Sequence, residues 1–337
     1  MTINWRRFIP RPLQPGVDIA LGSIRASATL ARNMPTAAGI GAGIVLGTTL
    51  ARALPLTRLM LYGAQRPLSR TPRDLGLAYE DVAFTAADDV QLRGWFVPAT
   101  PQAATVVLVH GWPWNRSGNR AGELPLPDRD VDYLAVAASL HQAGFQVLMF
   151  DLRNHGTSQR RPPVTFGLFE ARDVTAAVAY LRSRSDVDGA RIGALACSMG
   201  ANAVIFAAPD IQLRAAILVQ PVRVGPFTTA FSRALLGPAG PLLAKLADPL
   251  PRLLGGPALH TIDPTAAAAL LGETETLFVQ GGGDAWASVA EIEAMAARAP
   301  HARPLLVVPS QERYGGYQFV TTEAAYIAQF FRETLGG

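Results

Sequence analysis

The chain has 337 residues, 49% of them hydrophobic, and a formal net charge of +4 at pH 7. This length and composition are enough to bury a large core in one α/β domain with appendages. Ten arginines in residues 1–75 face only Asp18 and Asp74, so this segment carries +8 and the remainder −4. A mildly acidic body offers no surface that would follow a phosphate backbone, which argues against nucleic acid as a partner.

Residues 1–75 are predicted to form a basic and apolar N-terminal extension. Within it, residues 33–51 are uncharged, and as a helix they would span about 28 Å, close to the thickness of a bilayer core. Gly39, Gly43 and Gly47 would share one face of this helix, a spacing that lets membrane helices approach closely. The stretch is only weakly apolar, however. Two interpretations stay open: a membrane-anchoring segment of unreadable orientation, or a helical hairpin packed on an otherwise cytoplasmic body.

From residue 76 onward, strand and helix patterns alternate. The expected strands are 82–85, 91–97, 105–109, 145–150, 192–196, 215–219, 276–279 and 304–308, and the expected helices are 133–143, 168–183, 201–208, 289–297 and 322–335. This alternation predicts a mostly parallel, doubly wound α/β sheet over residues 76–337. It lapses at residues 221–271, where we expect a small helical cap inserted over the carboxyl edge of the sheet, the edge at which such sheets bind ligands.

The cysteine count and the glycine pattern bear on cofactors. Cys197 is the only cysteine, so an intramolecular disulfide and a thiolate metal site are excluded. No strand–glycine–helix phosphate loop and no cluster of His, Asp and Glu is evident in the sequence. We therefore expect neither a metal nor another cofactor.

Ser198 lies between an apolar run and a helix start that is rich in small residues. Residues 196–200, Ala-Cys-Ser-Met-Gly, are typical of a nucleophile elbow, a tight strand-to-helix turn that exposes one hydroxyl. Ala196 and Gly200 must be small because strand and helix pass close together there. A hydroxyl becomes a nucleophile at neutral pH only when a neighbouring base takes its proton.

Three further motifs follow predicted strands: His110-Gly111-Trp112, the loop from Asp151 through Arg153 to Ser158, and Gly281 to Asp284. Together with the elbow they make the chain resemble the α/β-hydrolase superfamily, in particular its bacterial serine esterases and serine-aminopeptidase-like members. The resemblance runs from about residue 77 to the end. It implies the α/β-hydrolase fold and hydrolysis of an ester, a thioester or a small amide.

The resemblance also implies a role for each matching residue. In the superfamily, the backbone N–H groups that follow the His-Gly turn and the nucleophile bind the oxyanion, which here are those of Trp112 and Met199. Asp284 falls where the superfamily places the acid that orients its histidine, although a helix N-cap is the alternative for this residue. Asp151 and Arg153 are expected to be structural residues that tie neighbouring turns together.

The chain departs from the superfamily at the base. The superfamily has a histidine in the loop after the last strand, where this chain has Tyr314 or, in an alternative alignment, Arg313. Tyrosine titrates at about pH 10 and arginine above about pH 12, so neither shuttles a proton at pH 7. His301 precedes the last strand and should lie at the opposite edge of the sheet. His260, in the expected cap, and His110 are minor alternatives.

Two functions remain open. The first is a serine hydrolase that acts through Ser198 with an impaired or unconventional base. The second is a catalytically inactive relative that serves as a membrane-tethered binding or scaffold protein. Phe227, Phe231 and the leucines of the expected cap suggest an apolar pocket for a small acyl substrate or ligand, unless these residues only pack the cap onto the sheet.

Overall fold

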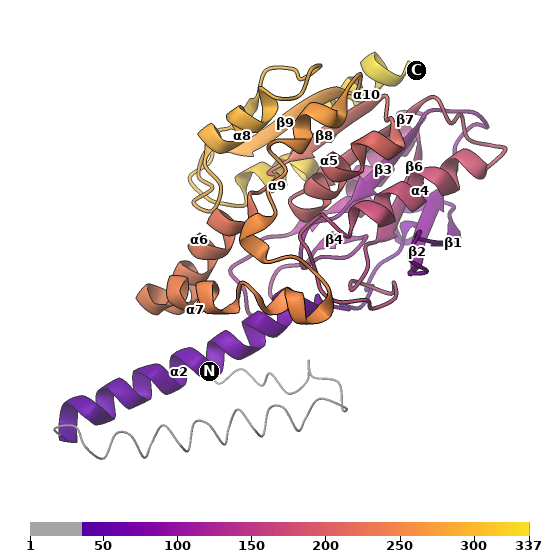
Figure 1. Ribbon diagram of the computed structural model, residues 1–337. Coiled ribbons are helices and arrows are strands. Elements are labelled where there is room, and N and C mark those ends of the chain that lie inside the picture. Colours follow the sequence, from indigo (N-terminus) through magenta and orange to yellow (C-terminus); the bar gives the residue numbers. More distant parts are fainter. Residues whose placement is uncertain (1–35, 337) are drawn as a thin grey trace.

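The computed structural model describes residues 36–336, which form an eight-stranded sheet with helices on both faces (Figure 1). The strands are β1 (Glu80–Thr85), β2 (Gln91–Val97), β3 (Thr105–Val109), β6 (Gln146–Asp151), β7 (Ile192–Cys197), β8 (Ala215–Val219), β9 (Glu275–Gly281) and β10 (Leu306–Val308). Their spatial order is β1-β2-β6-β3-β7-β8-β9-β10. Within this sheet β2 is antiparallel to β1 and β6, and the other neighbours are parallel. The expected α/β-hydrolase fold with a mostly parallel sheet is confirmed.

The central strands β3, β6, β7 and β8 are buried along their whole length. Both faces of the sheet are covered, which is why these segments are continuous apolar runs rather than alternating ones. One face packs against α4 (Ala171–Ser183), α5 (Met199–Ile211) and α8 (Val289–Ala296), and the other against α3 (Tyr133–Gln142), α9 (Gly315–Thr322) and α10 (Ala324–Leu335).

The parallel register brings the candidate residues to one edge of the sheet. Val109 at the end of β3 pairs with Ala196 near the end of β7, so the turn after each strand lies beside the other. β9 and β10 are likewise in parallel register and end together. The loop after β3 also carries a short ribbon of β4 (Gly118–Asn119) and β5 (Val131–Asp132).

The C-terminal segment differs from the prediction of one helix over 322–335. The structure has two helices there, and α9 begins at a pair of glycines, Gly315 and Gly316. Glycine is a poor helix former, so this pattern does not predict a helix start. The pair is needed because α9 passes close to the end of β9: a Cβ on Gly316 would lie 2.7 Å from the nitrogen of Gly281.

Between β8 and β9 the chain forms α6 (Val224–Leu236), α7 (Gly240–Ala247) and four short 3₁₀ turns, η5 (Gly237–Ala239), η6 (Leu250–Leu254), η7 (Leu259–Thr261) and η8 (Ala267–Leu271). These elements occupy the range that we propose as a cap, and we keep that name for residues 221–271. Phe227 and Phe231 of α6 are buried against Trp286, which follows β9. The helix α6 therefore lies over the carboxyl edge of the sheet.

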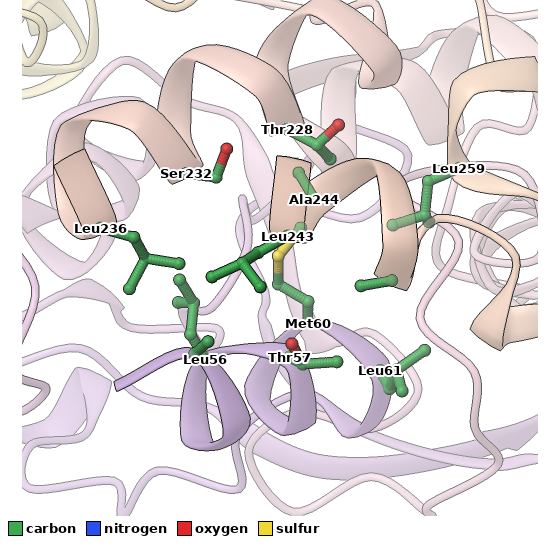
Figure 2. A pocket seen from close by; sticks show the side chains of 12 residues that line it. Leu56, Thr57, Met60, Leu61, Thr228, Ser232, Leu236, Leu243, Ala244 and Leu259 are labelled. Carbon is green, nitrogen blue, oxygen red and sulfur yellow. The ribbon is translucent and has the colours of Figure 1, made fainter. Parts of the chain in front are cut away.

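The helix α2 (Thr36–Tyr62) leads into the body, and its C-terminal part contacts the cap. Figure 2 shows Leu56 and Met60 of α2 facing Leu236 and Leu243 across an apolar pocket, whose volume of about 480 Å³ includes its open mouth. Within residues 36–336 no helix has both the length and the apolar character needed to cross a membrane. The expected anchoring segment at 33–51 begins outside the described residues and stays a prediction.

Replacing Gly200 should disrupt the elbow. A Cβ at this position would lie 2.5 Å from the carbonyl oxygen of Val109 and 2.6 Å from that of His110, and backbone atoms cannot move aside as a flexible side chain can. We expect Gly200→Ala to cost about 3 kcal/mol or more of unfolding free energy, measured by urea denaturation. Gly189→Ala is the control, because its Cβ would meet only the flexible Arg182 side chain, at 3.1 Å. Equal urea midpoints for the two variants would contradict the steric role of Gly200.

Candidate active site

Ser198 lies at the corner between β7 and α5 in a conformation that non-glycine residues rarely adopt. Its φ is 51° and its ψ is −117°, and its N–H donates to the carbonyl of Val219 at 2.9 Å. Such a strained backbone persists only where the surrounding structure enforces it. Here the enforcement comes from Gly200, which has no room for a Cβ against the end of β3. The side chain is 7% exposed, so the hydroxyl is reached only through a pocket.

The turn after β3 lies directly against this corner. A Cβ on Gly111 would be 3.3 Å from the Cβ of Ser198, so the two turns are in contact. The backbone N–H groups of Trp112 and Met199 donate no hydrogen bond to any residue in the 36–336 range. Met199 is also the first residue of α5, where the helix dipole favours negative charge. The two N–H groups are therefore available to bind an oxyanion.

Asp284 follows β9 and is buried, with three different donors on its carboxylate. The Trp286 N–H donates at 2.9 Å, the side-chain amide of Gln220 donates to Oδ2, and Arg313 Nη1 lies 2.8 Å from Oδ1 and 3.0 Å from Oδ2. The N-cap of α8 is Ser288, so the helix-cap interpretation of Asp284 is wrong. The carboxylate is instead fixed at the sheet edge by an arginine.

Arg313 takes the place beside Asp284 where the superfamily pattern would put an imidazole. Its guanidinium stacks 3.8 Å above the ring of Trp286, and Nη2 donates to the Tyr317 hydroxyl at 3.3 Å. Burial works to lower its pKa, but Tyr317 and Asp284 outweigh that effect and raise it above the usual value. A guanidinium in this setting keeps its proton, so it cannot act as a base.

The two tyrosines near Arg313 are placed differently. Tyr314, the residue aligned first with the missing histidine, lines the pocket, and burial raises its pKa well above the usual range. Tyr317 is 1% exposed. Burial raises its pKa to about 12, while the Arg313 charge acts in the opposite direction. The sequence did not single out Tyr317; the only available signal was its position four residues after Arg313, which is one helical turn.

The pocket over Ser198 has a volume of about 360 Å³, including its open mouth, and its walls are mainly aromatic. The aromatic residues are Trp112, Phe166, Phe227, Phe231, Trp286 and Tyr314. Phe227 and Phe231 are stacked with their ring centroids 5.4 Å apart, and Trp112 meets Phe231 edge-on at 5.6 Å. An apolar acyl or aryl group would suit this lining.

His110 is held in one tautomer, and its imidazole does not hydrogen-bond to Ser198. Its Nδ1 donates to the carbonyl of Gly111 at 2.9 Å, and its Nε2 accepts the N–H of Leu152 at 3.0 Å. Burial lowers its pKa to about 4. His155 lies beside it, with Nδ1 donating to the carbonyl of Arg153 at 2.8 Å, and burial lowers its pKa to about 3. Both rings are therefore neutral and structural.

The remaining histidines lie elsewhere. His260 is exposed and pairs with Asp248 at 2.5 Å, so the expectation that it could reach Ser198 is wrong. His301 pairs with Glu273, ahead of β9, at the edge opposite the elbow. All five histidines lie within residues 36–336, and none of them hydrogen-bonds to Ser198 or Asp284 there.

Asp151 and Arg153 form the loop after β6, away from the pocket lining. Asp151 accepts the N–H groups of Arg116 at 2.7 Å and Thr157 at 2.8 Å. Arg153 is fully buried and pairs with Asp173 at 2.7 Å. In the described part of the chain, no three His, Cys, Asp or Glu side chains gather in a way that could hold a metal ion.

The buried histidine pair should make folding stability depend on pH. Because their folded pKa values, about 4 for His110 and about 3 for His155, lie below the ordinary 6.5, the unfolded chain binds protons that the folded chain refuses. Stability should be full above about pH 6.5 and fall between about pH 6.5 and 4, by up to about 1.4 kcal/mol per pH unit for each ring.

Thermal unfolding between about pH 6.5 and 4 measures how steeply the folding stability changes with pH. His155→Leu should flatten this slope, because this variant lacks one of the two buried rings that bind a proton only after unfolding. His301→Leu, at an exposed position, should leave the slope as it is. If stability falls equally steeply with decreasing pH in both variants, the pH dependence does not come from the buried histidines.

With this geometry in view, the chain can be compared with known proteins. Residues 106–336 match the alpha/beta hydrolase family. YfhR of Salmonella typhimurium is 34% identical over 137 residues, which is 38% of this chain and 40% of YfhR. Rv2307c of Mycobacterium tuberculosis is 30% identical over 235 residues, 69% of this chain and 71% of that protein. The match thus spans about two fifths of the length of the first curated relatives.

Solved structures show the same fold. The Pyrococcus furiosus esterase Pf2001 superposes with a TM-score of 0.65 at 22% identity, covering 82% of this chain and 99% of that one. Est1E from Butyrivibrio proteoclasticus, solved with ferulic acid bound, has a TM-score of 0.51 at 17% identity and covers 76% of this chain and 100% of its own. At these identities the likeness concerns the fold alone. From the family match over residues 106–336, the chain belongs to the alpha/beta hydrolase family.

Proposed function

We propose that this protein is a serine hydrolase of impaired rate that acts on an ester, a thioester or a small amide through Ser198. The observation that carries the proposal is the Ser198 corner itself. A strained backbone presents a hydroxyl to a pocket with mainly aromatic walls, beside two N–H groups without hydrogen-bond partners among the described residues. Acyl transfer needs a positioned nucleophile and oxyanion donors, and both are arranged here.

In the proposed reaction, Ser198 Oγ attacks the acyl carbon, and the carbonyl oxygen takes up negative charge. The N–H groups of Trp112 and Met199 bind this oxygen. The step is slow because Arg313, which holds Asp284, cannot accept the serine proton. Sites that have lost a triad member still reach about 10³–10⁴ over the uncatalysed rate. Esters with good leaving groups should react best, because such groups depart without being protonated.

The second candidate is a catalytically inactive relative that binds an acyl ligand in the same pocket. The Arg313–Asp284 ion pair favours the inactive relative, since the carboxylate is already paired with the guanidinium. The two candidates differ in whether Ser198 reacts at all.

Covalent labelling with a fluorophosphonate separates the two candidates. Reaction at Ser198 adds one phosphonyl group, which intact-protein mass spectrometry detects, and Ser198→Ala is the control. Labelling of the folded wild-type protein and not of Ser198→Ala supports the hydrolase. No labelling of folded wild-type protein over hours would rule it out and leave the inactive binding protein.

Arg313→His should place an imidazole beside Asp284 and restore the acid–base pair. We expect p-nitrophenyl ester hydrolysis at neutral pH to increase by about 10²-fold or more, the usual contribution of a positioned general base. Arg313→Lys is the matched control, because it changes the same side chain without supplying a base. The double variant Arg313→His with Asp284→Asn should lose most of the gain.

Tyr314→His tests the other alignment in the same assay. Because Arg313 and not Tyr314 contacts Asp284, this variant should gain less than Arg313→His. If Arg313→His is no faster than Arg313→Lys, our placement of the missing base is wrong.

A further inference from the structure

We propose that the exposed side of the cap docks on an anionic lipid bilayer through Leu242 and Leu246 of α7, Leu253 of η6 and two neighbouring cations. These three leucines, with Lys245 and Arg252, are the lipid-docking face. The inference goes beyond the proposed function and does not depend on whether Ser198 reacts. It concerns contact with the bilayer surface and is separate from the predicted anchoring by residues 33–51.

The exposure of the leucines is the first observation. Leu242 is 62% exposed, Leu246 65% and Leu253 82%, which makes them the three most exposed large apolar side chains of the described residues. All three lie in one short segment, 242–253. Single exposed leucines are ordinary on a protein surface, whereas a cluster of them marks a surface that binds a partner.

The helix α7 is apolar on the side that faces solvent as well as on the side that faces the body. The residues that line the pocket between α7 and α2 are Leu243, Ala244 and Ala247 (Figure 2). At about 100° per residue, Leu242, Lys245 and Leu246 share the other side of the helix. A surface helix normally has polar residues on that side. The exposed side of α7 is therefore built for contact with an apolar partner.

The charge around these leucines is positive, which selects the partner. Residues 221–271 hold four basic and two acidic residues, whereas the rest of 76–337 has a net charge of −6. Lys245 and Arg252 are exposed, and neither pairs with an acid within residues 36–336. Asp248, which lies between them in the sequence, is hydrogen-bonded to the ring and the N–H of His260. Exposed apolar side chains beside unpaired cations are typical of a surface that binds anionic lipid.

The same charges disfavour two other occupants of this face. A second copy bound about a two-fold axis would bring the cations of the two molecules close together. Residues 1–35 also carry a surplus of positive charge, with five arginines and one aspartate. An anionic bilayer suits both kinds of residue, because its acyl chains take up the leucines and its phosphates attract the cations. Lys245 can reach those phosphates along its apolar stem.

The lipid-docking face is connected to the pocket over Ser198 through α6, which packs against α7. Phe227 and Phe231 of α6 line the pocket over Ser198. Thr228 and Ser232 of the same helix line the pocket between α7 and α2. A protein docked through α7 would therefore hold the pocket over Ser198 close to the bilayer, where apolar esters are concentrated.

A fluorescent label on the lipid-docking face tests the inference in the full-length protein. Leu246→Cys can be labelled with the environment-sensitive dye NBD, because the native Cys197 is buried. On adding vesicles of phosphatidylglycerol and phosphatidylcholine, we expect the emission to brighten and to shift to the blue. The matched control is Leu270→Cys, labelled in the same way. Leu270 is 55% exposed and precedes Thr274, which bonds to Leu213 at the edge of the sheet opposite the cap. Its emission should not change.

Vesicle sedimentation measures how much the leucines and the cations contribute. We expect Leu246→Gln to weaken binding about tenfold, and glutamine keeps α7 helical because it is a good helix former. Leu270→Gln should stay within about twofold of wild type, as for a surface site away from the contact. Lys245→Gln should weaken binding about fivefold on vesicles that contain phosphatidylglycerol, and not on pure phosphatidylcholine. Circular dichroism establishes that each variant is folded.

Three outcomes would overturn the inference. The first is that the wild-type protein does not sediment with anionic vesicles. The second is that it sediments while the label at 246 does not respond, so that another segment makes the contact. The third is a blue-shifted signal at 246 before lipid is added, which would mean that a second copy or another segment of the chain covers the face. Fluorophosphonate labelling of Ser198 reports separately on the proposed function.

Discussion

The ion pair between Arg313 and Asp284 is the interaction on which the chemistry of this site depends. Both groups are largely buried, Nη1 of Arg313 contacts both carboxylate oxygens, and the guanidinium is stacked on Trp286. Breaking a buried pair by removing one partner costs about 3–5 kcal/mol, because the other charge is left unpaired. The carboxylate is therefore committed to a cation that never gives up its proton at neutral pH. The proposed nucleophile Ser198 and the proposed oxyanion donors are left without an ordinary base.

The fold explains why these groups meet at all. Parallel strands deliver the turns after β3, β7 and β9 to one edge of the sheet, and α6 covers that edge with aromatic side chains. Backbone atoms of neighbouring segments lie close to Gly111, Gly200 and Gly316, so these turns can shift little relative to one another. The turns around the proposed nucleophile are thus tightly packed, and the group beside Asp284 is an arginine. This combination is what an impaired hydrolase and an inactive binding protein have in common.

Much of the fold could be predicted from the sequence because buried parallel strands leave an unmistakable pattern. The run from Ile192 through Gly200 carries both the strand and the small residues that the elbow requires, and so Ser198 could be identified without coordinates. The same reasoning failed at α9, since a helix that starts on Gly315 and Gly316 contradicts helix propensity. That start is imposed by the tight approach to β9, a tertiary effect that no local pattern records.

The sequence could predict which residues lie near the site, but not which of their side chains contact one another. Sequence alignment placed Tyr314 first and Arg313 as the alternative, whereas the contacts assign Arg313 to Asp284 and Tyr314 to the pocket wall. Tyr317 was not predicted because its contact with Arg313 depends on the direction in which α9 leaves the loop. The positions of His110 and His260 show the same limit, because neither imidazole hydrogen-bonds to Ser198 or Asp284.

Nitrogen NMR of the arginine side chains tests the central claim most directly. If Arg313 is clamped by Asp284, its two Nη nitrogens should give separate signals, because rotation about the guanidinium bond is blocked, and Asp284→Asn should merge them. We expect the separate signals to persist unchanged through neutral pH. A single averaged Nη signal for Arg313 in the wild-type protein, like that of an exposed arginine, would contradict the clamp.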